Sequence, residues 1–349
     1  MITYKLPYFL KIRNGILNSV VEILENNNID LKKILLVTDP IIYELYGHSL
    51  FESINKTYYI QKKLIKENSI LESSNIANYI INEDITVIIG IGGGRPLDVA
   101  KYASSMSKRP FISIPTTMAN DGVASPIAVL EDNNRRTKSL GCSVPSGILL
   151  DIDIIKSCPE ILIKAGIGDA LSNLTAIYDW ELDYTENNGE INDFAKLLSS
   201  IAVHSLLNNN NKDIRSDEFI NALAESIILS GMAMEIAGSS RPCSGSEHLF
   251  SHALDQINVE KKNLHGLQVA LGSIVSAYLQ KQDYKKFIKF LRDYDIDVNP
   301  ITLGITKEKF IYAFNNAKST RPNRYTILNK VEFNKEQISE LYDMLCMEV

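Results

Sequence analysis

Residues 86–101 read TVIIGIGGGRPLDVAK: an apolar β-branched run, a glycine cluster and then a helix-like stretch. The glycines would let the backbone approach a ligand closely, and Pro96 suits the first turn of a helix. Free amides and the helix dipole at such a turn favour a pyrophosphate, so we predict a nucleotide site. A tight turn without a ligand is the alternative, because a lone glycine motif is weak evidence.

Short apolar runs on both sides of this unit are typical of buried strands. Together with the run at 86–90 in this unit, the predicted strands lie at 34–38, 57–60, 111–114 and 147–151. Helix-like stretches occur between them at 41–53, 70–82 and 96–107, so we predict a parallel α/β sheet. The glycine loop follows the third strand and lacks G-x-G-x-x-G spacing, which fits an ordinary Rossmann unit poorly. Residues 127–141, with DNNRR at their centre, predict an inserted β-hairpin.

The pattern changes after residue 151, where long helical stretches follow one another with no convincing strand between them. They lie at about 159–184, 190–208, 215–237, 244–257, 263–281 and 334–347. We therefore expect an α/β dinucleotide-binding domain over 1–155 and an all-α domain over 156–349. The boundary falls in the stretch from Asp151 to Pro159, where Pro159 and Glu160 can open a helix after the last strand.

Composition narrows the class of protein. A chain of 349 residues with 45% hydrophobic content can build two cores, and a net charge of -6 argues against a nucleic-acid partner. No apolar run approaches the roughly 20 residues that span a bilayer, and the start lacks a signal pattern, so we expect a cytoplasmic protein without a membrane partner. Cysteines at 142, 158, 243 and 346 show no CxxC spacing and indicate reduced thiols. Cys243 fits a buried thiol better than a metal ligand.

Three polar residues of the second half form a candidate metal site. They are Asp169 in GIGDA, His248 in SGSEHLFSH and His265 in NLHG. A carboxylate and two imidazoles would leave a coordination position for a substrate oxygen. Spacing alone would instead pair His248 with His252, because residues four apart share a helix face. A lone histidine on an apolar helix is more often a core residue, so the residues alone leave the roles open.

Two aspartates of the first half have a functional and a structural interpretation each. Asp39, at the end of the first strand, could accept bonds from an adenosine ribose or cap the helix that begins at Pro40. Asp121, in PTTMANDGVASP, could orient substrate hydroxyls or belong to a solvated turn. Hydroxyls and amides of the same loop could hold a cofactor.

Six motifs, taken in order, resemble those of sn-glycerol-1-phosphate dehydrogenases, which belong to the iron-alcohol-dehydrogenase and dehydroquinate-synthase superfamily. The motifs are GGGRPLDVAK, PTTMANDGVASP, AGIGDALSN, DWELD, GSSRPCSGSEHLFSHALD and LHGLQVALG. With the tail motif RPNRYTIL at 321–328, the resemblance runs from about Ile34 to Leu328. It implies a dehydroquinate synthase-like fold.

The resemblance also implies roles for individual residues. Asp169, His248 and His265 would bind zinc, and Asp169, Asp121 and His252 would contact substrate, the last two with catalytic roles. The glycine segment, two threonines and a serine would bind the dinucleotide. Asp39 is a candidate for contact with its ribose. The glycine-segment, threonine and serine positions are Gly92, Gly93, Gly94, Arg95, Pro96, Leu97, Asp98, Thr116, Thr117 and Ser125.

Two departures from the family pattern affect the cofactors. Iron-dependent relatives place a histidine four residues after the metal aspartate, where this chain has Asn173. Zinc is therefore expected before iron, with nickel or manganese as further alternatives. Arg95 stands where many relatives have lysine, which can alter phosphate contacts and the choice between NAD and NADP.

The activity implied by the resemblance is reduction of dihydroxyacetone phosphate to sn-glycerol 1-phosphate by NADH or NADPH. The metal would polarise the carbonyl, and His252, through a hydroxyl or water, would supply the proton. Lys318, Arg321 and Arg324 form a basic cluster that could clamp the substrate phosphate. They could equally tie a C-terminal loop down through ordinary ion pairs. We expect a homo-oligomer that acts on a small molecule.

Three other functions share parts of this pattern. A glycerol dehydrogenase would use the same metal chemistry on an unphosphorylated polyol, although Trp180 and the tail motif favour the phosphate-using branch. A 3-dehydroquinate synthase would use zinc and NAD, but its lysine-rich motifs and N-x-GHTxGHA stretch are missing from the sequence. A noncatalytic sensor would bind NAD without consuming NADH when a ketone is added.

Overall fold

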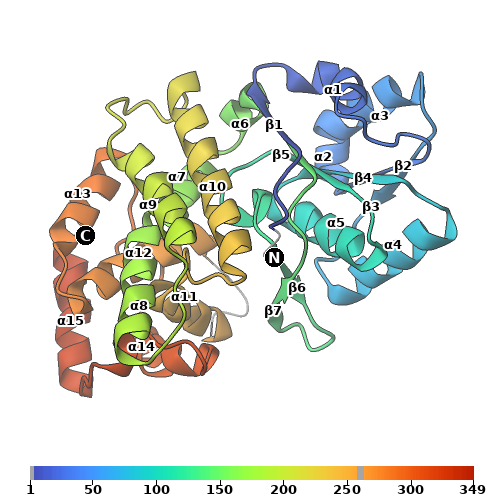
Figure 1. Ribbon diagram of the computed structural model, residues 1–349. Coiled ribbons are helices and arrows are strands. Elements are labelled where there is room, and N and C mark those ends of the chain that lie inside the picture. The colour runs from blue at the N-terminus through green and yellow to red at the C-terminus, as the bar shows by residue number, and fades with distance from the viewer. Residues whose placement is uncertain (1–3, 258–262) are drawn as a thin grey trace.

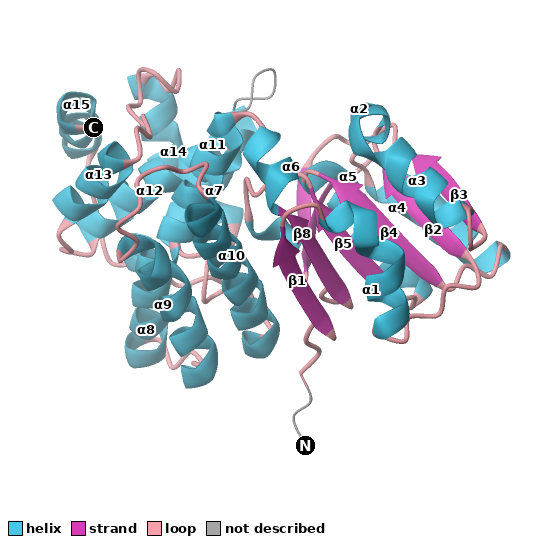
Figure 2. Cartoon of the chain, turned by 90° about the horizontal axis from the view of Figure 1, so that it is seen from above, coloured by secondary structure: helices cyan, strands magenta, loops and turns pink. Residues whose placement is uncertain are grey.

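The N-terminal half is built on a six-stranded parallel sheet in the order β1-β8-β5-β4-β2-β3. The computed structural model describes residues 4–257 and 263–349. Figure 2 shows the sheet on one side of the molecule and a mass of helices on the other. The strands are β1 (Phe9–Arg13), β2 (Ile34–Thr38), β3 (Ile60–Leu64), β4 (Val87–Gly92), β5 (Phe111–Pro115) and β8 (Gly147–Asp151). The predicted fold class, a parallel α/β half followed by a helical half, is confirmed.

Helices cover both faces of this sheet. Ile34 and Leu36 of β2 pack into one core with α1 (Val20–Asn26) and α3 (His48–Asn55), which the short helix α2 (Pro40–Ile42) precedes. Leu35 and Val37 pack into a second core, with α4 (Ile70–Asn82) and α5 (Gly94–Ser107). Burial on both faces explains the continuous apolar runs that predict the central strands.

The two edge strands differ from the sequence-based expectation. β1 has no predicted counterpart, and β3 lies at 60–64 rather than 57–60. Both carry charged residues that stay at least partly exposed, such as Lys11 in β1 and Lys62 in β3. Edge strands are partly solvated and often carry lysine, so a search for continuous apolar runs misses or shifts them.

A β-hairpin projects from the sheet half, as the sequence predicts. It consists of β6 (Ile127–Glu131) and β7 (Thr137–Gly141), paired antiparallel. Figure 1 shows it below the sheet, on the side of the helical half. The buried ammonium of Lys101 on α5 donates to the carbonyl oxygens of Gly122 at 2.8 Å and Ile127 at 2.6 Å, which anchors the start of the hairpin.

The C-terminal half is helical, and no strand follows β8 within 4–257 and 263–349. The predicted helix at 159–184 is two helices that meet at Ser172, and α13 and α14 have no predicted counterpart. The predicted domain boundary at 155/156 falls inside α6, and the division there stays a prediction. The helices are α6 (Ile152–Ser157), α7 (Glu160–Leu171), α8 (Asn173–Glu186), α9 (Asp193–Leu207), α10 (Asp217–Ala237), α11 (Ser246–Ile257), α12 (His265–Leu279), α13 (Tyr284–Asp293), α14 (Lys307–Thr320) and α15 (Lys335–Glu348).

Helix α10 is the one described helix that is long and apolar enough to cross a membrane by length and composition. Core helices pass the same test, and 67% of its most apolar window is buried inside the protein. It contributes Phe219, Ile220, Leu223 and Ile227 to the main core of the helical half. This packing makes α10 an interior element of the fold.

Two glycines let α7 and α12 pack backbone against backbone. A Cβ atom on Gly266 would lie 1.9 Å from the carbonyl oxygen of Ala165, and one on Gly168 would lie 2.5 Å from that of Gly266. Asp169 follows Gly168, and His265 precedes Gly266. The close helix contact therefore determines how near these two side chains can come.

We expect Gly266→Ala to lower the free energy of unfolding by about 3 kcal/mol, because the added methyl overlaps a backbone atom that cannot rotate away. Gly141→Ala is the control, since no atom lies within 4 Å of its added Cβ, and it should change stability by less than about 0.5 kcal/mol. Denaturant unfolding of the metal-free proteins measures both. Equal midpoints for the two variants would contradict the close-packing account.

Candidate active site

Asp169, His248 and His265 come together in the helical half, although they lie on α7, on α11 and at the first residue of α12. One ligand atom from each lies within 4.8 Å of the others. The Nε2 atoms of both histidines lie 3.7 Å from Asp169 Oδ1. The structure thus brings the three predicted ligands together, and we refer to them as the triad.

The chemistry of the triad fits a cation. Asp169 Oδ1 is buried and has no hydrogen-bond partner, whereas its Oδ2 accepts a bond from the backbone N–H of Asp121 at 3.1 Å. Burial raises the pKa of Asp169 to about 7 and lowers that of His248 well below its usual value. Neutral imidazoles are the form that coordinates metal, and an unpartnered buried carboxylate oxygen is costly without a cation. Two nitrogens and one oxygen therefore suit a divalent transition metal.

His252 lies one turn after His248 and outside the triad. Its ring centre is 6.3 Å from that of His248 and 6.0 Å from that of His265. Burial and the neighbouring imidazoles lower the pKa of His252 well below its usual value, so the ring is neutral near pH 7. It borders the cavity described below, where a neutral imidazole can pass on a proton. Its predicted catalytic role stays a prediction.

Asp121 begins a short 3₁₀ helix (Asp121–Val123) directly over the triad. Its backbone N–H holds Asp169, and its side chain lines the cavity. Burial raises the pKa of Asp121 to about 7, and repulsion from the carboxylate of Asp169 is the second cause. A carboxyl group with that pKa can accept or release a proton near neutral pH.

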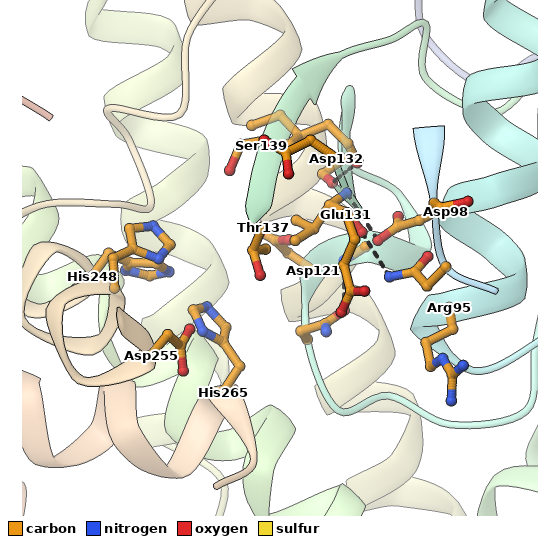
Figure 3. Close-up of a pocket in the computed structure, with 18 of the residues that line it drawn as sticks. Arg95, Asp98, Asp121, Glu131, Asp132, Thr137, Ser139, His248, Asp255 and His265 are labelled. Atoms are coloured by element: carbon orange, nitrogen blue, oxygen red, sulfur yellow. Dashed lines mark hydrogen bonds between the residues drawn. The ribbon is translucent and has the colours of Figure 1, made fainter. Parts of the chain in front are cut away.

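A cavity of about 890 Å³ lies between the two histidines of the triad and the first turns of α5. His248 and His265 line it from the helical half, and Arg95 and Asp98 line it from α5. Figure 3 shows these pairs on opposite sides of the space. The volume is that of a small-molecule or cofactor site, and its place between the two halves is typical of one.

The glycine loop has the backbone shape that the sequence predicts. Gly92 has φ of +150°, and a Cβ there would lie 2.3 Å from the Pro96 ring. Gly93 is the N-cap residue of α5, and no side chain caps the helix there. Thr116 Oγ1 is buried and without a hydrogen-bond partner at the end of the adjacent strand β5. Helix amides that no side chain caps, together with an unpaired hydroxyl, are groups that a cofactor phosphate could engage.

The remaining predicted cofactor residues fall into two groups. Arg95 is exposed, Thr117 is half-buried and Ser125 is buried; Arg95 and Ser125 line the cavity. Pro96 and Leu97 are buried in the first turn of α5. Their predicted cofactor contacts stay predictions.

Two predicted cofactor aspartates have local structural partners. Asp98 is buried, where it accepts bonds from Lys101 and from the backbone N–H of Val129, both at 3.1 Å. Asp39 accepts a bond from the backbone N–H of Ile42 at 2.9 Å, which is the helix-capping role considered from sequence. Asp39 is not among the residues that line the cavity, and its contact with a ribose stays a prediction.

The three basic residues near the C-terminus occupy different places. Arg321 lines the cavity and reaches the hairpin, where it donates to Ser139 Oγ at 3.0 Å. Arg324 is more enclosed, and it donates to Ser240 Oγ at 2.8 Å and to the carbonyl oxygen of Ser244. It borders a neighbouring cavity rather than the one with the triad. Lys318 is exposed and lines neither cavity.

Two buried charged residues at the site lie outside the sequence-predicted set. Lys101 holds the loop after β5 through the carbonyl of Gly122, and Glu247 contacts the ring of His248. Both side chains are essentially unexposed. The one sequence signal for Glu247 is its place directly before the candidate ligand His248. Its burial, which makes it notable, depends on the tertiary fold.

The family model that matches this chain and three proteins similar to it in sequence are all described as dehydrogenases. A family model described as iron-containing alcohol dehydrogenase matches residues 11–159. A glycerol-1-phosphate dehydrogenase (NAD(P)+) of Thermococcus sibiricus is 38% identical over 308 residues, which is 87% of each chain. The proteins of that name from Nitrosopumilus maritimus and Methanosphaera stadtmanae are 38% and 35% identical over 79% and 95% of this chain, and 77% and 94% of their own.

Solved structures show the same fold at low identity. Glycerol dehydrogenase from Schizosaccharomyces pombe superimposes with a TM-score of 0.81 at 19% identity, covering 99% of this chain and 90% of that one. Sulfoacetaldehyde reductase from Bifidobacterium kashiwanohense in complex with NAD+ gives 0.75 at 15% identity, covering 100% of both chains. These likenesses concern the fold alone.

Proposed function

The chain belongs to the glycerol-1-phosphate dehydrogenase family, and on that premise we propose that it catalyses the reversible reduction of dihydroxyacetone phosphate to sn-glycerol 1-phosphate with NADH or NADPH. The observation that carries the proposal is a cavity lined on one side by His248 and His265 of the triad and on the other by Arg95 and Asp98 in the first turns of α5. The names of relatives at 35–38% identity supply the activity and the cofactor class.

The reaction moves one hydride and one proton. The hydride leaves the reduced nicotinamide for the carbonyl carbon, the carbonyl oxygen gains a proton, and NAD(P)+ and a secondary alcohol result. A divalent cation held by Asp169, His248 and His265 would supply a Lewis acid that polarises the carbonyl. His252 and Asp121 line the cavity and carry or relay the proton, because each can be neutral near pH 7.

We propose zinc as the cation, with nickel, manganese or iron as alternatives. Two imidazole nitrogens and one carboxylate oxygen suit zinc in a catalytic site. The side chain of Asn173 supports a set of three ligands. Its amide donates to the carbonyl of Ser199 and to Ser230 Oγ, on α9 and α10, and so is occupied elsewhere.

The cofactor is proposed to lie along the carboxyl ends of the strands, with its pyrophosphate at Gly92, Gly93 and Gly94. The uncapped start of α5 and the unpartnered hydroxyl of Thr116 support this placement. Arg95, exposed on the cavity wall, can meet a cofactor phosphate and bears on the choice between NAD and NADP.

The setting of the enzyme is also a proposal. We propose a cytoplasmic homo-oligomer that acts on a small molecule without nucleic-acid or membrane partners. Four free cysteines support a reducing compartment, and the net charge of -6 disfavours nucleic acid. The exposed side chains of Phe194, Leu197 and Ile201 on α9 support burial in a subunit contact.

Oxidation of NADH and NADPH with dihydroxyacetone phosphate and, separately, dihydroxyacetone tests the function. We expect kcat/KM to favour the phosphorylated ketone by about 100-fold, as charge-assisted bonds to a phosphate would give. The product should be the sn-1 enantiomer, identified with a dehydrogenase specific for glycerol 3-phosphate. Equal or better use of dihydroxyacetone would indicate a glycerol dehydrogenase, and cofactor binding without turnover would indicate a sensor.

A further inference from the structure

Glu247 is a fully buried carboxylate that neither the sequence nor the proposed reaction accounts for. It is the second residue of α11, directly before His248, and its exposed fraction is 0%. Placing a charge in the protein interior costs free energy unless specific partners compensate it. Its partners therefore indicate what the side chain is for.

Three donors converge on this carboxylate. Oε1 lies within hydrogen-bond distance of His248 Nδ1, at 2.9 Å, and accepts a bond from the backbone N–H of Gly245. Oε2 accepts a bond from Thr175 Oγ1 on α8, also at 2.9 Å. These three contacts fix the carboxyl group in one orientation, and when it accepts a bond from the neutral imidazole, the imidazole proton lies on Nδ1.

That proton position bears on the triad. With the proton on Nδ1, the lone pair of His248 lies on Nε2, the atom 3.7 Å from the unpartnered Oδ1 of Asp169. A carboxylate bonded to the far nitrogen of a metal-binding histidine also orients the ring and raises its basicity. Both effects favour coordination through Nε2.

The second histidine of the triad has a hydroxyl near its Nδ1, and Asp255 lies beside its ring (Figure 3). His265 Nδ1 lies 3.4 Å from the hydroxyl of Ser251, which is itself 3.0 Å from the amide of Gln268. A neutral hydroxyl at that distance orients the ring little compared with a carboxylate at 2.9 Å. Of these two contacts at Nδ1, the one between His248 and Glu247 is the shorter.

We infer that Glu247 is a positioning residue for the metal: through His248 Nδ1 it selects the tautomer and orientation in which Nε2 binds the cation. The inference rests on the proposed function, because it takes the triad to be the metal site. Glu247 lies behind His248 and is absent from the cavity wall, so it acts on the reaction only through that ring.

The test is the zinc dissociation constant, measured by competition with a chromogenic chelator. Glu247→Gln keeps the shape but loses the charge and should weaken zinc binding about tenfold, and Glu247→Ala about 100-fold. Asp179→Asn is the matched control. Asp179 is equally buried in the same region and accepts bonds from the backbone N–H groups of Ser246 and Ile327, but it touches no member of the triad. Its zinc affinity should stay within about threefold of the wild type, whatever its effect on stability.

Two further measurements distinguish a role of Glu247 in positioning the metal from a purely structural role. Cobalt substitution should give a visible absorption spectrum that changes in Glu247→Gln and not in Asp179→Asn. Nitrogen NMR of the wild-type metal-free protein should show His248 protonated at Nδ1, which needs no variant to fold. Unchanged zinc affinity in Glu247→Gln, an equal loss in Asp179→Asn, or protonation at Nε2 would each overturn the inference. Failure of the wild type to bind any divalent metal would instead overturn the proposed function.

Discussion

His248→Ala is expected to abolish zinc binding and to lower kcat/KM for dihydroxyacetone phosphate by about 10³-fold, equivalent to about 4 kcal/mol of transition-state stabilisation. The reason is geometric. His248 Nε2 and His265 Nε2 both lie 3.7 Å from Asp169 Oδ1, so loss of either imidazole leaves two ligands for the cation. His265→Ala should therefore behave in the same way. Metal analysis of the purified variants, with steady-state kinetics on the same preparations, measures both effects.

His204→Ala is the control for this experiment. His204 is exposed on α9 and is hydrogen-bonded to Ser200, outside the cavity that holds the triad. It should retain zinc and full activity. Full turnover by metal-free His248→Ala protein would contradict the assignment of the triad as the catalytic metal site.

Arg321→Ala is expected to raise KM for dihydroxyacetone phosphate about 100-fold, while KM for dihydroxyacetone changes less than about twofold. Arg321 is the one member of the C-terminal basic cluster that lines the cavity with the triad. Its guanidinium already donates to Ser240 Oγ and Ser139 Oγ, so it is held near the place where a phosphate would lie. A guanidinium that is fixed before binding loses little entropy on meeting a phosphate.

Lys318→Ala controls for a general loss of positive charge in this region. Lys318 is exposed on α14, three residues earlier, and lines neither cavity, so its loss should leave both KM values unchanged. If Arg321→Ala had the wild-type KM for the phosphorylated ketone, Arg321 would be removed from phosphate recognition. Equal increases of KM for the two ketones would indicate a damaged cavity rather than a lost phosphate contact.

The sequence predicts best those strands in which every residue is buried. β2 and β8 are buried along their whole length, and their apolar runs predict them residue for residue. β1, at the sheet edge, has one buried residue, Phe9, followed by exposed or partly exposed ones, and its sequence FLKIR contains no continuous apolar run. Helix ends can also be predicted where nearby residues determine them. The side chain of Ser69 caps α4 by accepting a bond from the backbone N–H of Glu72, and α4 has the predicted range of 70–82.

The site depends on contacts between distant residues, which local patterns do not contain. Helical spacing alone pairs His248 with His252, whereas the structure joins His248 to His265 on another helix. The motif resemblance identifies that pairing, and close packing of α7 on α12 brings it about physically. The carboxylate of Glu247 stands beside His248 in the chain, yet its burial and its bond to Nδ1 follow only from the packing of α8 against α11.

Anomalous diffraction from crystals of the zinc-loaded enzyme, with data collected on both sides of the zinc absorption edge, tests the central claim most directly. The account predicts one strong peak in the cavity, about 2.0–2.2 Å from His248 Nε2, His265 Nε2 and a carboxylate oxygen of Asp169. A peak elsewhere, or one bound by His252 in place of His265, would contradict it.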